Sequence, residues 1–174
     1  PIKQELDDIL SGEIQLENQH IEIKETFRLS DHEIESYKYN NIYKVRDETI
    51  NGRTELLNKF KYLCAREIAG FLNTKGGRLY IGIGDKANPS RDVKGFVMLE
   101  TLDKTNQDLN NFLENTFTKI ITQECIKTNF IKYNSKYICV IEIKEVSQKY
   151  WPVLIGSYNK QKMKNLFYIR RDDE

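Results

Sequence analysis

One stretch near the middle of the chain, residues 71–85, constrains the fold more than any other. Its first residues are typical of the last turn of a helix, and the Gly-Gly pair at 76–77 supplies the left-handed backbone positions that end a helix. Over residues 79–84 aliphatic side chains alternate with a tyrosine and two glycines. This alternation predicts a strand with one aliphatic face and one nearly bare face.

A bare strand face lets another backbone, or a ligand, approach closely. Asp85 follows the end of this strand, where a carboxylate can serve as a metal ligand or as a base. The alternative is a glycine-weakened edge strand that ends in an Asp-initiated turn.

The rest of the chain predicts a mixed β-sheet flanked by helices, in the α/β (α+β) class. Helical spacing of apolar residues covers 2–10, 54–74 and 105–122, and strand patterns cover 20–27, 77–85, 126–133, 137–146 and 166–169. A hairpin turn is predicted at 134–135. The 174 residues are expected to form one domain, 1–174, with a long insertion at about 28–53. The chain is also a candidate fragment of a longer protein.

Composition restricts the classes of function. The chain has 27 basic and 26 acidic residues, so the strongly basic character of a non-specific DNA-coating protein is missing, although a local basic groove remains compatible. Three cysteines without CxxC spacing give no support to a disulfide framework, Cys64 and Cys139 are predicted to be small buried residues, and a cytoplasmic protein is expected. No apolar run is long enough to span a membrane.

The strand at 20–27 places Glu22 and Lys24 on one face and the isoleucines at 21 and 23 on the other. Glu17 has the opposite parity, so its carboxylate meets that of Glu22 only if the chain bends at residues 18–19. The alternative is an exposed edge strand whose Glu–Lys pair lies in solvent and contributes well under about 1 kcal/mol.

Nucleotide-cofactor and triad motifs are missing from the sequence, which has no GxxxxGK, HExxH or GxSxG and only two histidines. Three acids lie on or beside predicted strands: Glu17, Glu22 and Asp85. Converging carboxylates repel one another unless a cation lies between them, and Mg²⁺ or Mn²⁺ is the natural partner. Such an ion can activate water for attack on phosphorus, while Lys24 neutralises charge developing on the phosphate.

Segment 28–53 interleaves tyrosines with basic residues, a pattern that suits bases stacked on rings and phosphates on cations. Equally, these tyrosines can pack the segment onto the domain. The basic residues predicted to contact nucleic acid are Lys38, Lys44, Arg46, Lys75, Arg78, Lys160, Lys162 and Arg170.

Two of these motifs and the end of the chain together resemble the Schlafen AlbA_2 family. Residues 17–24, Glu-Asn-Gln-His-Ile-Glu-Ile-Lys, are similar to its ExxxxExK stretch, and residues 71–85 with Gly95 are similar to its central glycine-rich block. Residues 167–170 resemble its closing strand, so the resemblance spans nearly the whole chain. It implies one lobe of a Schlafen-like core, a possible homodimer, and catalytic carboxylates at Glu17, Glu22 and Asp85. The long 28–53 segment departs from the family pattern.

The resemblance implies a Mg²⁺- or Mn²⁺-dependent endoribonuclease that cuts structured RNA, with tRNA the first candidate substrate and DNA the second. A toxin-like or antiviral effector, with a fused sensor or effector domain, is the expected setting. The alternative hypothesis is a non-catalytic nucleic-acid-binding module of a transcriptional regulator. A third is nucleotide binding on the glycine-rich strand.

Overall fold

The protein is described by a computed structural model that covers residues 2–14, 18–37, 42–45, 48–51, 53–87, 89–156 and 166–170. Side chains are not described at 37, 42–45, 48–51, 53–55 and 166. The helices are α1 (Ile2–Ser11), α2 (Asp31–Tyr37), α3 (Arg53–Leu72), α4 (Leu102–Phe117), α5 (Lys119–Cys125) and the 3-10 turn η1 (Gln148–Tyr150). The strands are β1 (Ile21–Lys24), β2 (Ile42–Val45), β3 (Glu48–Asn51), β4 (Gly77–Ile81), β5 (Ile126–Tyr133), β6 (Lys136–Ile143), β7 (Leu154–Ile155) and β8 (Leu166–Phe167).

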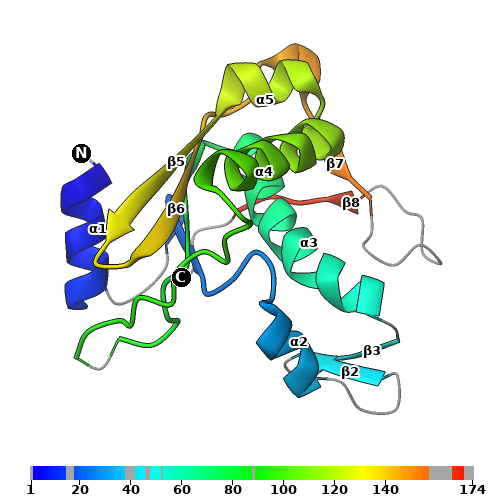
Figure 1. The fold of residues 1–174 in the computed structure, drawn as a ribbon. Coiled ribbons are helices and arrows are strands. Elements are labelled where there is room, and N and C mark those ends of the chain that lie inside the picture. Colours follow the sequence, from blue (N-terminus) through cyan, green and yellow to red (C-terminus); the bar gives the residue numbers. More distant parts are fainter. Residues whose placement is uncertain are drawn as a thin grey trace.

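The central sheet has four strands in the order β1-β4-β6-β5 (Figure 1). β1 and β4 are parallel, whereas β4–β6 and β6–β5 are antiparallel, so the sheet is mixed as predicted. The predicted hairpin joins β5 to β6, with Asn134 in the left-handed region at φ 55°. Because β4 lies between β1 and β6, the reading of residues 71–85 as an edge strand is wrong.

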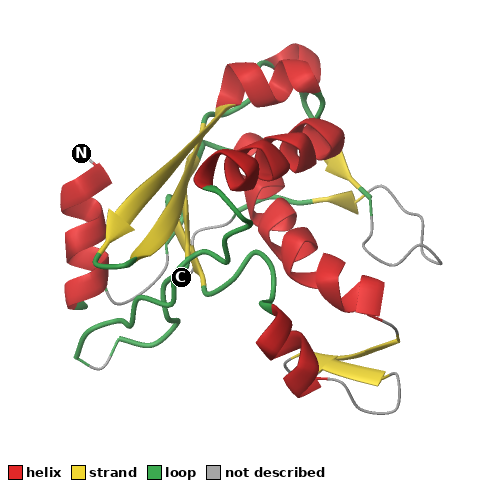
Figure 2. Ribbon diagram, in the orientation of Figure 1, coloured by secondary structure: helices red, strands yellow, loops and turns green. Residues whose placement is uncertain are grey.

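Helices cover both faces of this sheet (Figure 2). On one face, α1 packs its Leu6, Ile9 and Leu10 against Ile21 and Ile23 of β1 and the neighbouring strands. On the other face, residues of α3, α4 and α5 form the larger core with the remaining side chains of β4 and β6. The fold is therefore α+β, and the face opposite α1 carries the polar side chains of β1. None of the helices within the described residues combines the length and the hydropathy that a membrane span requires.

The predicted alternation along the glycine-rich strand fails at one residue. Leu79 and Ile81 face the larger core, but Ile83 joins the α1 face together with Tyr80. The strand ends at Ile81 because Gly82 has φ +104°, and this left-handed residue reverses the side-chain order that follows it. A Cβ at Gly82 would lie 2.8 Å from the carbonyl carbon of Gly95. The group that lies close to this bare glycine is therefore the protein's own backbone at Gly95. Nucleotide binding on this strand stays a prediction.

Two further segments differ from the sequence-based predictions. The predicted helix 105–122 is two helices, α4 and α5, separated by Thr118 at φ 75°, whose hydroxyl accepts a hydrogen bond from the amide of Ile121 at 3.4 Å. Segment 28–53, predicted as mostly irregular, contains α2 and the β2–β3 hairpin. Short elements of four to seven residues have too few periods for hydrophobic spacing to be recognised.

Asn73, directly after α3, holds the end of the chain in place. Its amide nitrogen donates to the carbonyls of Val153 and Tyr168, both at 2.9 Å, and its amide oxygen accepts from the Val153 backbone at 2.7 Å. A Cβ at Gly70 would lie 3.0 Å from Cγ of Arg170, so a glycine in α3 allows this segment to lie close to the helix. The result is that Arg170 reaches β1.

Candidate functional site

Parallel pairing brings the carboxyl ends of β1 and β4 to the same edge of the sheet. Lys24 pairs with Ile81 in the register, so Glu25 and the loop from Gly82 to Asp85 continue from adjacent strand ends. The backbone amide of Asp85 donates to Oε1 of Glu25 at 3.2 Å. Acids on both strands therefore meet at this edge, as is common for sites in sheets with parallel strands.

A buried arginine fixes the loop that carries Asp85. Arg91 is only 6% exposed, and its Nη1 donates to the backbone carbonyls of both Gly84 and Asp85. The amide of Gly84 in turn donates to the carbonyl of Asp92 at 2.8 Å. These bonds hold the backbone of Asp85 while its side chain remains exposed at the surface.

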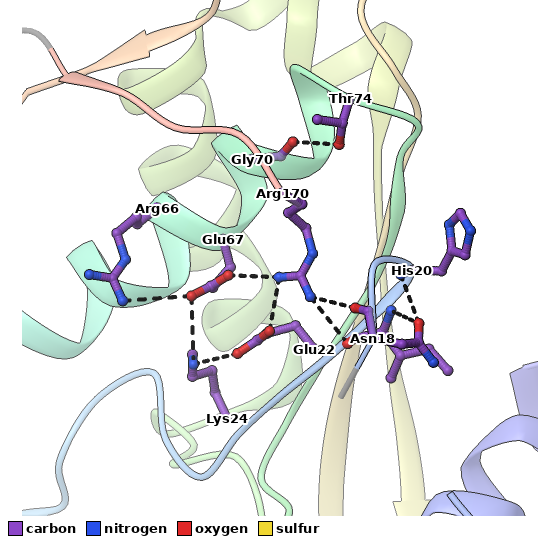
Figure 3. Close-up of polar contacts among 10 residues, drawn as sticks. Asn18, His20, Glu22, Lys24, Arg66, Glu67, Gly70, Thr74 and Arg170 are labelled. Carbon is purple, nitrogen blue, oxygen red and sulfur yellow. Dashed lines mark hydrogen bonds and ion pairs between the residues drawn. The ribbon is translucent and has the colours of Figure 1, made fainter. Parts of the chain in front are cut away.

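Four charged side chains, Glu22, Lys24, Glu67 and Arg170, form a compact cluster on the α3 side of β1 (Figure 3). Nζ of Lys24 lies 2.6 Å from Oε1 of Glu22 and 3.7 Å from Oε1 of Glu67. Nη1 of Arg170 lies 2.9 Å from Oε2 of Glu22 and 2.8 Å from Oε2 of Glu67. We refer to these four residues as the charge cluster.

The charge cluster is largely shielded from water. Its side chains are between 8% and 16% exposed, so the Glu22–Lys24 pair is not the solvent-exposed pair of the alternative reading. Within the cluster, two carboxylates and two cations balance one another. A fifth charged side chain, Arg66, is 40% exposed, and its Nη2 lies 3.7 Å from Oε1 of Glu67 (Figure 3). Desolvated charges are tolerated when they are paired and hydrogen-bonded in this way, because an unpaired charge would lose its hydration without replacement.

Arg170 also binds backbone. Its Nη2 donates to the carbonyl of Asn18 at 2.6 Å and, more weakly, to that of Ile21 at 3.4 Å, and its guanidinium lies 4.3 Å from the centre of the Phe71 ring. The residue therefore joins the start of β1, helix α3 and the chain's last described segment. Arginine suits this role because its planar group presents several fixed donors.

A cysteine lies beneath the charge cluster. Cys64 is fully buried, and burial raises the pKa of its thiol to about 12, with the carboxylates of Glu67 and Glu22 acting in the same direction and Lys24 opposing them. The thiol is therefore protonated and unsuited to nucleophilic chemistry. Cys64 and Cys139 are free and buried, as the sequence predicts, and Cys125 is free and buried as well.

A cavity of about 550 Å³ opens beside the charge cluster at the same edge of the sheet. Its lining comes from the end of β1, the start of α2, helix α3, the Asp85 loop and residues 94–97, and comprises Lys24, Glu25, Thr26, Leu29, Ser30, Glu33, Phe60, Leu63, Asp85, Lys94, Gly95 and Val97. Lys24 belongs both to the charge cluster and to this lining. The structure thus brings Glu22, Lys24 and Arg170 together, with Asp85 across the adjoining cavity.

The sequence matches the family model for Schlafen, AlbA_2 over residues 17–174, most of the chain. The chain belongs to the Schlafen AlbA_2 family. A search of curated proteins gave no match. Among solved structures, the fold is similar to the solution structure of an N-terminal domain from Nitrosomonas europaea, in a protein named for its relation to the ATP-dependent DNA helicase RecG. The identity is 14%, the TM-score is 0.51, and the match covers 98% of this chain and 90% of that chain.

Other residues predicted for the site of this Schlafen AlbA_2 domain lie elsewhere or are not described. Glu17, Lys38, Arg46, Lys160 and Lys162 fall outside the described residues, as does the side chain of Lys44. Arg78 lies at the opposite end of β4 from Asp85, where its guanidinium binds Glu5 at 2.5 and 2.8 Å. Lys75 is exposed at that same end, so the structure separates these two cations from the charge cluster.

The carboxylates of the described residues do not by themselves fit a divalent ion. Across the described ranges, no three histidine, cysteine, aspartate or glutamate side chains are grouped closely enough to hold a metal. Both oxygens of Glu22 are bound, one by Lys24 and one by Arg170. A three-carboxylate metal site in this domain would therefore need Glu17, together with a rearranged Glu22.

Three residues of the site are missing from the sequence-based prediction: Glu25, Glu67 and Arg91. Glu67 had a recognisable signal, because it lies three residues after Cys64 and four before Phe71, at the border of the apolar stripe of α3. A charged residue at such a position needs a buried partner. Arg91 had no comparable signal, since its partners are backbone carbonyls.

Proposed function

We propose that this domain binds structured RNA, with tRNA as the first candidate, and cleaves its sugar–phosphate backbone. The proposal rests on family membership over residues 17–174. The observation that carries it is the position of Lys24, which reaches the carboxylates of Glu22 and Glu67 and also lines the cavity that Asp85 enters. A phosphate in this cavity meets a cation and carboxylates at the same place.

Each residue has a distinct role in this proposal. Lys24 offsets negative charge on the phosphate, and Arg170 orients Glu22 by its ion pair. The exposed carboxylate of Asp85, whose backbone Arg91 holds, accepts a proton from the water that attacks phosphorus. The bond from phosphorus to the leaving sugar oxygen breaks, and that oxygen takes a proton from solvent. A Mg²⁺ or Mn²⁺ ion, where Glu17 completes its ligands, would supply further charge neutralisation at the phosphate.

A second candidate is a nucleic-acid-binding module without catalysis. The neutralised charge cluster favours it, because both oxygens of Glu22 are occupied by cations and the described residues contain no three-acid group. The fold neighbour's name refers to a DNA helicase, so DNA is included in the test, although at 14% identity the likeness concerns the fold alone.

The test is incubation of the purified domain with total tRNA or a DNA hairpin, in Mn²⁺, in Mg²⁺ and in chelator. The informative variant is Asp85→Asn, because Asp85 is exposed and its loss leaves the charge cluster intact. Asp92→Asn, with a side chain 84% exposed on the same loop, is the matched control. We expect metal-dependent fragments from wild type and Asp92→Asn, and a loss of about 10²- to 10⁴-fold in Asp85→Asn.

Other outcomes separate the candidates. Intact tRNA that is retained equally by all three proteins would establish the binding module and reject the nuclease. Fragments that persist at full rate in Asp85→Asn would reject the assigned site. A domain that neither retains nor cuts RNA or DNA would reject both candidates.

A further inference from the structure

The cavity beside Asp85 has one wall that comes from the family-atypical segment 28–53. Leu29, Ser30 and Glu33 line it; the first two directly precede α2, and Glu33 lies in its first turn (Figure 1). The carboxylate of Glu33 accepts hydrogen bonds from the backbone amide and hydroxyl of Ser30 at 2.7 and 2.9 Å. These internal bonds cap α2 and fix this wall, so it presents the apolar side chain of Leu29 in a defined position.

An aromatic ring also lines the cavity. Phe60, from α3, is half-buried, packs against the small core of Leu29, Ile34 and Leu56, and lines the cavity. Leu63 and Val97 add further apolar surface to the same lining. A ring held by its own core cluster costs little entropy when a flat ligand stacks on it.

The charged side chains of the lining are two lysines and three carboxylates, Glu25, Glu33 and Asp85. Glu33 accepts hydrogen bonds from Ser30, and Glu25 accepts one from the Asp85 amide, which leaves the lysines as the cationic part of the lining. Lys24 lies within the charge cluster, and Lys94 is 51% exposed, with its nearest described carboxylate, Asp92, 3.9 Å away. Apolar, aromatic and cationic groups in one cavity of about 550 Å³ are the combination that accepts a base and its phosphate. The volume lies within the range of about 300–1,000 Å³ typical of small-ligand sites.

We propose that this cavity receives one unpaired nucleotide of the RNA, with its base against Phe60 and its phosphate near Lys24 and Lys94. This inference rests on the proposed RNA binding and adds a requirement that the nucleotide be unpaired. A base within a duplex is stacked and paired on both sides, and only a bulged, looped or terminal base can enter a pocket. The domain then selects structured RNA at positions where a single nucleotide leaves the helix.

The test compares equilibrium binding of two labelled RNA hairpins in chelator, where a metal-dependent cleavage would not interfere. One hairpin has a single bulged nucleotide and the other is fully paired in its stem. The variants are Phe60→Leu, which keeps apolar volume but removes the ring, and Phe60→Tyr, which keeps the ring. Tyr133→Leu is the matched control, because this tyrosine is 38% exposed at the β5–β6 hairpin, outside the cavity lining.

We expect wild type, Phe60→Tyr and Tyr133→Leu to bind the bulged hairpin about tenfold more tightly than the paired one, and Phe60→Leu to lose most of this ratio. A 4-thiouridine at the bulge should cross-link to Phe60 or to residues 24–30. An unchanged ratio in a folded Phe60→Leu, or equal binding of both hairpins by wild type, would overturn the inference while RNA binding stands. Tight, bulge-selective binding without any cleavage in Mn²⁺ would support the pocket and reject the nuclease.

Discussion

Removal of Arg170 from the charge cluster gives the sharpest test of the structure. Arg170→Met keeps a similar length and apolar stem but leaves the two shielded carboxylates facing one shielded ammonium, a net charge of −1 where the four wild-type side chains are neutral. The guanidinium of Arg66, 3.7 Å from Oε1 of Glu67, is 40% exposed and screened by solvent, so it offsets this charge only in part. Adding Glu67→Gln restores neutrality, because the Glu22–Lys24 pair remains alone. The double variant should therefore be more stable than Arg170→Met, although a second charged group of the cluster has been replaced.

The magnitudes follow from the burial of the four side chains and from the ion pairs that each substitution removes. The cluster's side chains are at most 16% exposed, so solvent screening is weak, and breaking such a pair by removing one partner costs about 3–5 kcal/mol. Glu67→Gln alone removes charge-assisted hydrogen bonds worth about 1.5–3 kcal/mol. If the two substitutions acted independently, the double variant would lose roughly 6 kcal/mol of unfolding free energy. Because the double variant leaves a neutral ion pair, we expect it to lose only about 2–3 kcal/mol.

The assay is urea unfolding followed by circular dichroism at fixed pH and salt, with thermal melting as a second measurement. For a chain of 174 residues, Arg170→Met should lower the melting temperature by roughly 6–20 °C. Lys104→Met, which breaks the pair with Glu100 whose side chains are 57% and 79% exposed, is the control and should change stability by less than about 1 kcal/mol. A double variant whose loss of stability equals the sum of the single losses would refute the reasoning, since the four charges would then not act as one unit.

Three further predictions concern the core and the glycine-rich loop. Burial raises the pKa of the Cys64 thiol from 9.0 to about 12, so folding favours the neutral thiol. The resulting contribution to the free energy of unfolding is complete below about pH 9 and is lost as the pH rises toward 12. Urea titrations at alkaline pH should therefore show a falling unfolding midpoint. A thiol reagent at pH 8 should label Cys64 and Cys139 only after unfolding, and rapid labelling of either in the native protein would contradict their burial. Gly82→Ala places a Cβ within 2.8 Å of the Gly95 backbone at a residue with φ +104°, and should destabilise the fold by about 1–3 kcal/mol. Gly156→Ala is the control, because no atom lies within 4 Å of the Cβ that it adds. Equal urea midpoints for the two variants would contradict a strained loop at Gly82.

Local periodicity was sufficient for most of the fold. α1, α3 and the β5–β6 hairpin lie close to their predicted ranges, because each has several repeats of its apolar pattern and a clear stop signal. α2 and the β2–β3 hairpin were missed, since each is too short for a period to emerge. The single helix predicted at 105–122 was divided by one residue, Thr118, whose left-handed conformation is atypical of threonine.

The candidate site was predictable only in part. The parity of β1 correctly placed Glu22 and Lys24 on one face, since side chains alternate strictly along a strand. The contact between Arg170 and Glu22 joins positions 148 residues apart, and no spacing rule addresses such a distance. The convergence of Glu17 with Glu22 and Asp85 stays a prediction, because Glu17 lies outside the described residues.

The sequence by itself determined the α+β class, the family, the polar face of β1 and the acid that follows the glycine-rich strand. All of these depend on residue order over short distances, which φ/ψ preferences and side-chain alternation translate directly into structure. Tertiary structure decided which charges neutralise one another: Glu67 of α3 and Arg170 of the last described segment close around Glu22 and Lys24. The physical reason is that buried charges must be balanced by whatever side chains the packing brings near, and packing of distant segments is set by the whole core rather than by any one stretch.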